Sequence, residues 1–134
     1  MQRGKVASVV FVNNDKKILL HLRDDKPDIQ SPNTWGFIGG HIDEGESVSD
    51  ALKREVKEEI NFDVKNPVLV TKFDDCVGND VVVYLAKIDS RLDELELNEG
   101  QKIEFFSFDE IMKLDRVPKV IIDFLNEFKE KIFE

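Results

Sequence analysis

The 134-residue sequence is poor in cysteine, in positive charge and in long apolar segments. Its one cysteine, Cys76, excludes an intrachain disulfide, and we therefore expect a cytoplasmic protein. No apolar run is long enough to cross a membrane, and the run near the amino terminus is too short for a signal peptide. Internal repeats, low-complexity segments and linkers are also absent. We therefore expect residues 1–134 to form a single domain without a membrane partner.

The deficit of positive charge limits the choice of partners. The chain has 19 Lys and Arg against 28 Asp and Glu, which gives a formal net charge of −9. An acidic protein gains no electrostatic attraction to a polyanion, so we expect no nucleic acid partner. A small phosphorylated ligand remains compatible with this charge if metal ions neutralise it locally.

What the sequence does contain is a series of β-branched runs separated by turn signals. Residues 5–12 and 17–23 predict a hairpin, and residues 35–40 predict a short strand that breaks at its two glycines. Residues 62–76 and 79–88 predict two further strands joined by a Gly78-Asn79 turn. Residues 102–108 predict the last strand. The polar segment 24–34 predicts a surface loop.

Three helices are predicted between and after these strands. The first runs from an N-cap at Ser47 to about Ile60, and Asn61 closes it in the left-handed conformation. A short helix near residues 109–114 has a capping box formed by Ser107 and Glu110. The final helix contains Pro118 in its first turn. Its apolar stripe consists of Ile121, Leu125, Phe128 and Ile132. Strands interleaved with helices predict an α/β fold with a mixed sheet covered by helices.

The first helix carries an unusual cluster of glutamates. Each residue advances by ~100° around a helix, so Glu55 and Glu59 fall inside the apolar arc and Glu58 falls at its edge. A surface helix rich in Glu and Lys is the common alternative. Unpaired carboxylates that face a core are costly, however, and need a partner or a cation. Hard ions such as Mg²⁺ or Mn²⁺ accept oxygen ligands of this kind, so we expect the three carboxylates to converge on a metal ion.

The residues around this cluster fit the same interpretation. Gly39 and Gly40 allow the backbone to turn sharply and to present carbonyl oxygens next to the carboxylates. Arg54 could pair with Glu46 or Glu58 and so orient the loop before the helix. A plain surface ion pair, which contributes ~0–1 kcal/mol, is the alternative for Arg54.

The segment from Gly40 to Phe62 resembles the Nudix box, G-x5-E-x7-R-E-U-x-E-E-x-G-U, in which U is a bulky aliphatic residue. The charged positions all agree in spacing; they are Glu46, Arg54, Glu55, Glu58 and Glu59. Asn61 replaces the glycine, and Phe62 replaces the aliphatic residue at the end. Just outside the box, Ile38 replaces the proline that commonly precedes the Gly-Gly pair.

This resemblance implies a Nudix-type α/β/α sandwich with a mixed sheet between helices. It implies a MutT-like, metal-dependent pyrophosphohydrolase that cleaves a nucleoside diphosphate linked to another moiety by attack of water on phosphorus. A (d)NTP is the favoured small-molecule substrate. The alternatives are a hydrolase of nucleotide sugars and a Nudix-fold module that binds a nucleotide without cleaving it. Relatives of this kind lead us to expect a monomer or a homodimer.

The resemblance also implies roles for individual residues. Glu55, Glu58, Glu59 and the backbone carbonyl of Gly40 or Gly39 would bind Mg²⁺ or Mn²⁺. Glu46 and Arg54 would shape the catalytic loop.

Further residues of the site lie outside the box. Glu99 would act as an additional ligand or base, with Glu96 and Glu104 as substitutes and a solvated loop carboxylate as the ordinary alternative. Arg23 would contact a phosphate, or else be an exposed charge at a sheet edge. Trp35 would stack on a base, and Gly39 would border the substrate; packing is the alternative for Trp35.

Overall fold

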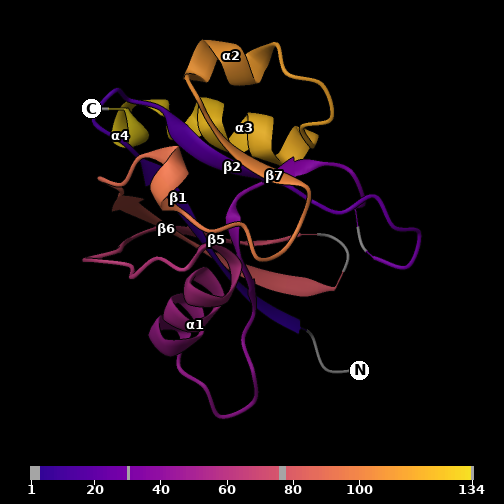
Figure 1. Cartoon of the computed structure of the whole chain (residues 1–134). Coiled ribbons are helices and arrows are strands. Elements are labelled where there is room, and N and C mark those ends of the chain that lie inside the picture. The colour runs from indigo at the N-terminus through magenta and orange to yellow at the C-terminus, as the bar shows by residue number, and fades with distance from the viewer. Residues whose placement is uncertain (1–3, 30, 76–77, 134) are drawn as a thin grey trace.

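The computed structural model describes residues 4–29, 31–75 and 78–133. Seven strands form one mixed sheet, which lies between α1 on one side and α2, α3 and α4 on the other (Figure 1). The predicted α/β/α sandwich is therefore confirmed. In chain order the elements are β1 (Gly4–Val12), β2 (Ile18–Leu22), β3 (Trp35–Gly36), β4 (Ile38–His41), α1 (Val48–Ile60), β5 (Val68–Asp74), β6 (Asn79–Lys87), the 3-10 turn η1 (Leu92–Glu94), β7 (Lys102–Phe106), α2 (Phe108–Met112), α3 (Lys119–Glu127) and α4 (Lys129–Ile132).

β1 is the central strand and is buried on both faces of the sheet. It runs parallel to β6 along its whole length, and β5 pairs antiparallel with β6 at the sheet edge. Ala7, Val9 and Phe11 pack under α1, whereas Val10 packs under α3 on the opposite face. Burial on both faces explains why the strand reads as an almost continuous apolar run.

The predicted hairpin of β1 and β2 forms only next to its turn, where Val12 pairs with Ile18. Beyond that point the two strands separate, and the next segment fills the space between them. β3 pairs with β2, while β4 pairs with β1 through Gly39 opposite Ser8 and Gly40 opposite Ala7. The strand predicted for residues 35–40 is thus two strands. The interruption lies at Phe37 rather than at the glycines.

α1 begins and ends as the sequence predicts. The Ser47 hydroxyl accepts a hydrogen bond from the Asp50 N–H at 3.1 Å, and Asn61 has the left-handed angles φ 53° and ψ 45°. In α2 both halves of the Ser107–Glu110 box are present.

Two further predicted elements differ from the structure. The strand expected from Phe62 begins at Val68, because Asn66 is left-handed (φ 49°) and Pro67 follows it. The final helix is two helices, since Phe128 leaves helical geometry at φ −107° and ψ 16°. Pro118 caps α3 rather than lying inside its first turn.

Two sequence predictions concern residues at the edge of what the structure describes. Gly78 adopts φ 100° just before β6, as a turn requires, but the preceding turn residues lie outside the described part. Cys76 also lies outside it.

No helix in the described ranges has the length and apolar character that a membrane crossing requires.

Candidate active site

The three helical glutamates differ in exposure in the way that the helical wheel predicts. Glu59 is buried, at 7% relative exposure. The side chain of Glu55 is 15% exposed, and that of Glu58 is 57% exposed. α1 therefore presents two carboxyl groups to the body of the protein and a third at the rim.

Glu59 lies against the glycine strand β4. The Gly39 N–H donates a hydrogen bond to Glu59 Oε2 at 3.2 Å. Burial nevertheless raises the pKa of the Glu59 carboxyl to about 8. The Gly39 hydrogen bond and the Arg23 charge oppose this rise, and the charges of Glu55 and Glu99 add to it. One hydrogen bond is therefore not enough to stabilise the ionised form of Glu59.

Glu55 occupies the space above Gly40. A Cβ atom on residue 40 would lie 2.5 and 2.7 Å from the two carboxylate oxygens of Glu55, so only glycine allows this approach. Burial also raises the pKa of Glu55, whereas Arg54 lowers it and the charges of Glu58 and Glu99 raise it. Two adjacent carboxyl groups on one helix face thus have a raised pKa for the same physical reason.

Arg54 connects the helix to the loop that precedes it. Its Nε and one terminal nitrogen donate to the two oxygens of Glu46 at 2.8 and 2.9 Å, a bidentate pair. The other terminal nitrogen donates to Glu55 Oε1 at 2.9 Å and to Glu58 Oε2 at 3.3 Å. The His41 carbonyl accepts a further hydrogen bond at 3.1 Å. The predicted pairing with Glu46 and Glu58 is present, and Glu55 is an additional partner.

The pKa values of Glu46 and Arg54 show that the two side chains stabilise each other's charged form. The Arg54 guanidinium, together with the Asp43 N–H, lowers the pKa of the Glu46 carboxyl to about 2. The same contacts raise the pKa of Arg54 above its usual range. The loop from His41 to Glu46 is therefore fixed by a fully ionised pair.

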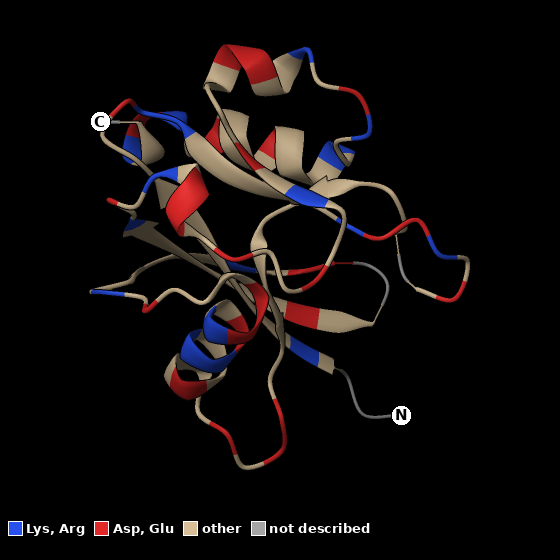
Figure 2. Cartoon of the chain, in the orientation of Figure 1, with Lys and Arg blue, Asp and Glu red and all other residues tan. Residues whose placement is uncertain are grey.

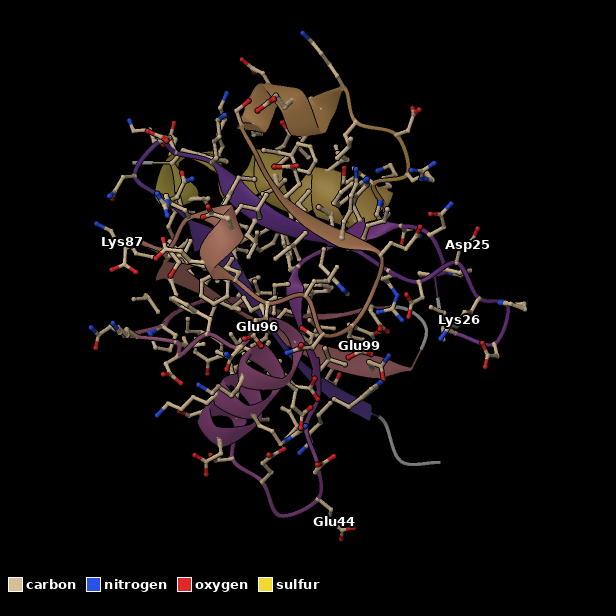
Figure 3. The ribbon with its side chains drawn as sticks, viewed as in Figure 1. Asp25, Lys26, Glu44, Lys87, Glu96 and Glu99 are labelled. Carbon is tan, nitrogen blue, oxygen red and sulfur yellow. The ribbon has the colours of Figure 1, made fainter. Side chains whose placement is uncertain are left out.

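Glu99 reaches the site from a loop that crosses the carboxyl end of α1 (Figure 3). The Asn98 N–H donates to the Glu59 carbonyl at 2.9 Å, and the Glu96 N–H donates to the Ile60 carbonyl at 3.2 Å. The Glu99 charge raises the pKa of both Glu55 and Glu59. Of the three carboxylates considered from the sequence, Glu104 lies within β7, and Glu99 is the one whose charge acts on both Glu55 and Glu59.

His21 holds this loop to the sheet, a role that sequence reasoning missed. His21 is 6% exposed, and its Nε2 lies 2.6 Å from the Glu99 carbonyl oxygen, to which it donates. Gly100 follows with φ 91°, where a side chain would collide with the imidazole. The two partners are separated by 78 residues, so the sequence carried no signal for their contact.

Arg23 and Trp35 differ from each other in their environment. Arg23 follows β2 directly, and its charge acts on the pKa of Glu59. Trp35 is 3% exposed and packs edge-on against Phe106 at 5.1 Å between ring centroids. The predicted stacking of Trp35 on a base is therefore wrong, because the core already covers the ring.

The predicted convergence of carboxylates does not occur in this side-chain arrangement. Among the described residues, no group of three or more His, Cys, Asp or Glu is placed to hold a metal ion. The reason is visible in the contacts: Glu55 and Glu58 turn toward Arg54, and Glu59 turns toward Gly39. The oxygen-only donor set and the two raised pKa values still suit a hard divalent cation.

Comparison with known proteins matches residues 2–128 to the model of the NUDIX domain family. An RNA pyrophosphohydrolase of a Nitratiruptor species is 31% identical over 121 residues, which cover 90% of this chain and 69% of that protein. A dihydroneopterin triphosphate diphosphatase of Escherichia coli (strain K12) is 38% identical over 56 residues, 42% of this chain. Those residues span only 34% of that protein's length.

Solved structures give the same result for the fold. The MutT protein from Methanosarcina mazei Go1 superposes with a TM-score of 0.81 at 18% identity, over 99% of this chain and 97% of that one. A C. elegans Ap4A hydrolase binary complex has a TM-score of 0.75 at 23% identity, over 95% of this chain and 97% of that one. At these identities the likeness shows the fold.

Proposed function

This chain belongs to the Nudix family of phosphoanhydride hydrolases, and we propose that it cleaves a nucleoside triphosphate by attack of water on phosphorus. The observation that carries this proposal is the arrangement of Glu55, Glu59 and Glu99. The Glu55 carboxylate lies over Gly40, and the Glu59 carboxylate accepts a hydrogen bond from the Gly39 N–H. Burial raises the pKa of both groups, the charge of Glu99 adds to both rises, and the charge of Glu55 adds to that of Glu59. Such an excess of negative charge suits the binding of cations and, through them, of phosphates.

Mg²⁺ or Mn²⁺ is the cofactor that this site would hold. Glu55, Glu58, Glu59 and Glu99 are the candidate ligands, together with the backbone carbonyl of Gly40. A bound cation of this type neutralises phosphate charge and lowers the pKa of water. To bind it, Glu55 and Glu58 would have to turn away from Arg54, and Glu59 from Gly39.

The other groups of the chain have separate tasks in this proposal. Arg54 holds Glu46 and the His41 carbonyl, and so fixes the loop beside the glutamates. Arg23 would bind a phosphate oxygen, since it lies close enough to influence Glu59. A glutamate that is not fully committed to the cation would accept the proton of the attacking water. Gly39 borders the same space through its backbone.

Of the two alternative substrates, one has the support of a relative. The relative named RNA pyrophosphohydrolase suggests the pyrophosphate bond of an RNA, although the net charge of −9 gives no attraction to the rest of an RNA chain. A nucleotide sugar contains the same type of bond. Binding without cleavage is less well supported, because all the box glutamates are present. A cytoplasmic location and a monomer or homodimer remain predictions.

A substrate panel tests the proposal. The purified protein is incubated with nucleoside triphosphates, nucleotide sugars, dinucleotides and an RNA with a 5′-triphosphate, each with Mg²⁺, Mn²⁺ or EDTA. Release of phosphate and pyrophosphate is followed. We expect turnover of the nucleoside triphosphates that EDTA abolishes. Turnover confined to another class would correct the substrate, and binding without turnover of any compound would overturn the proposed activity.

A further inference from the structure

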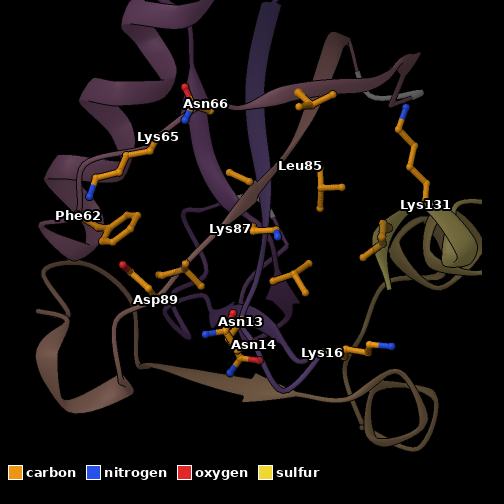
Figure 4. A pocket seen from close by; sticks show the side chains of 15 residues that line it. Asn13, Asn14, Lys16, Phe62, Lys65, Asn66, Leu85, Lys87, Asp89 and Lys131 are labelled. Carbon is orange, nitrogen blue, oxygen red and sulfur yellow. The ribbon is translucent and has the colours of Figure 1, made fainter. Parts of the chain in front are cut away.

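A hollow of ≈ 760 Å³ lies at the end of the sheet where the parallel strands β1 and β6 finish. Its walls come from the β1–β2 turn, the α1–β5 connection, the end of β6 and α4 (Figure 4). That volume is within the ~300–1,000 Å³ typical of small-molecule sites. In open α/β sheets, ligands tend to bind beyond the carboxyl ends of parallel strands.

This hollow is separate from the candidate active site. Gly40 pairs with Ala7 of β1, whereas Val12, which lines the hollow, is five residues further along the same strand. At ~3.3 Å per residue the two places are ~17 Å apart. Figure 3 shows Lys87, which lines the hollow, and Glu99 of the active site on different sides of the molecule.

Four lysines surround the hollow, and we call it the lysine pocket. They are Lys16, Lys65, Lys87 and Lys131, and the one lining carboxylate is Asp89. No ion pair to any of the four is found in the described part of the chain. In Figure 2 the basic segments of the β1–β2 turn, α4 and the end of β6 lie on one side of the molecule, with acidic segments among them. This local surplus of positive charge favours an anion.

The floor and wall of the lysine pocket are apolar. Ala86 and Ile88, which are nearly buried, form the floor on the side of the sheet that carries Phe62, whereas Leu85 lines the pocket from the opposite side. Phe62 forms part of the wall, and Phe11 holds it edge-on at 5.4 Å between ring centroids. An aromatic side chain in this position can pack against a planar group of a ligand.

The rim also contains amides that are not engaged elsewhere. The side chains of Asn14 and Asn66 line the pocket and make no hydrogen bond in the described part of the chain. They can donate and accept, as recognition of a base or sugar edge requires. Charge, apolar floor and free amides thus occur together around one cavity.

We propose that the lysine pocket is a second ligand site, which binds a small organic phosphate with a planar ring, such as a nucleoside monophosphate. A phosphate monoester carries a charge of about −1.5 to −2 near neutral pH, which several ammonium groups match better than one. The ring would lie on the β6 floor beside Phe62. Because lysines rather than carboxylates hold the phosphate, binding does not require a divalent cation.

The test is a titration of the ¹⁵N-labelled protein with AMP in EDTA, followed by amide NMR shifts. We expect saturable shifts at Asn14, Lys65 and Ile88 and none at Gly39 or Glu59. Adenosine and inorganic phosphate alone should each bind about tenfold more weakly than AMP, since each supplies half of the contacts.

Lys65→Ala/Lys87→Ala is the diagnostic variant, and Lys72→Ala/Lys113→Ala removes the same charge elsewhere on exposed surface. We expect the first to weaken AMP binding about tenfold and the second to leave it within about twofold. Both should hydrolyse nucleotides as wild type does. Equal weakening by both variants would reduce the effect to net charge and overturn the proposal. Shifts at the active site alone, or no saturable shifts, would also overturn it.

Discussion

At the scale of single residues, the Glu55 carboxylate occupies the space that a side chain on residue 40 would need. Gly40→Ala would place a methyl group where the Glu55 carboxylate lies, so the carboxylate must move. We expect a loss of activity of about 100-fold with little change in thermal stability, because displacement of a catalytic group by ~1 Å has effects of that size. The measurement compares the turnover of Gly40→Ala and wild type in the presence of Mg²⁺.

Gly36→Ala is the matched control for this change. Its added Cβ would meet only Ile121 Cδ1, at 3.9 Å, so the same substitution finds room there. Activity of Gly36→Ala should stay near that of wild type. Full activity of Gly40→Ala would contradict the role given to Glu55.

The raised pKa of Glu59 predicts that the stability of the metal-free protein depends on pH. Its pKa is about 8 in the folded state against 4.5 as the ordinary value. Between these values the folded protein keeps a proton that the unfolded chain has released, so the free energy of unfolding falls as the pH rises. Glu59→Gln removes this dependence and keeps an oxygen for the Gly39 N–H.

Urea unfolding in EDTA at several pH values measures the effect. We expect Glu59→Gln and wild type to be nearly equal at about pH 4.5 and the variant to be more stable by a few kcal/mol above about pH 8. Mg²⁺ should reduce that advantage. A difference that does not change with pH would show that burial does not shift the Glu59 pKa.

Helical phase explains which residues of the site were predictable. The positions of Glu55 and Glu59 follow from the ~100° step alone, and the structure confirms them. The contact of His21 with Glu99 joins residues that are far apart in sequence and depends on the whole sheet. The burial of Trp35 depends on Phe106 in the same way. Nonlocal packing is what the sequence pattern does not contain.

At the scale of elements, α1 depends on its amino-terminal cap. The Ser47 hydroxyl satisfies the Asp50 N–H, which is otherwise without a partner inside the helix. We expect Ser47→Ala to lower the free energy of unfolding by about 1 kcal/mol. Ser49→Ala, two residues later in the exposed first turn, should be neutral or slightly stabilising. Equal effects of the two substitutions would contradict the cap.

The loop that carries Glu99 depends on His21 in a comparable way. His21→Leu removes the hydrogen bond to the Glu99 carbonyl, so the loop should lose its position and the turnover number should fall about tenfold or more. His21→Gln offers an N–H of similar reach and should restore most of the turnover. Rates of both variants, compared at equal folded fraction, measure this. If the two variants lose activity equally, the hydrogen bond does not position Glu99.

The elements that were predicted correctly are those with local signals at both ends. α1 has a polar cap and a left-handed Asn61, and α2 has a complete capping box. The opening of the β1–β2 hairpin had no local signal, because it depends on β3 and β4 entering between the strands. The break at Phe128 had no local signal either, and Phe128 packs against the core cluster that contains Phe124 and Ile132.

At the scale of the whole molecule, the sheet keeps the two proposed ligand sites apart. Glu55 and Glu59 of α1 lie against β4, and the lysine pocket lies where β1 and β6 end. The net charge of −9 is therefore unevenly distributed: a cation is expected at one place and an anion at the other. β1 contributes to both places, since Ala7 pairs with Gly40 beside the carboxylates and Val12 lines the lysine pocket.

The most direct test of the central claim is hydrolysis of a nucleoside triphosphate at varied Mg²⁺ concentration by wild type, Glu58→Gln and Glu130→Gln. Glu58→Gln keeps the shape of the side chain and removes one charge from the site, whereas Glu130→Gln removes the same charge from exposed α4. We predict that Glu58→Gln lowers turnover about 100-fold or more and that Glu130→Gln does not. Equal turnover by all three proteins, or turnover that persists in EDTA, would contradict the claim that these glutamates form a metal-dependent active site.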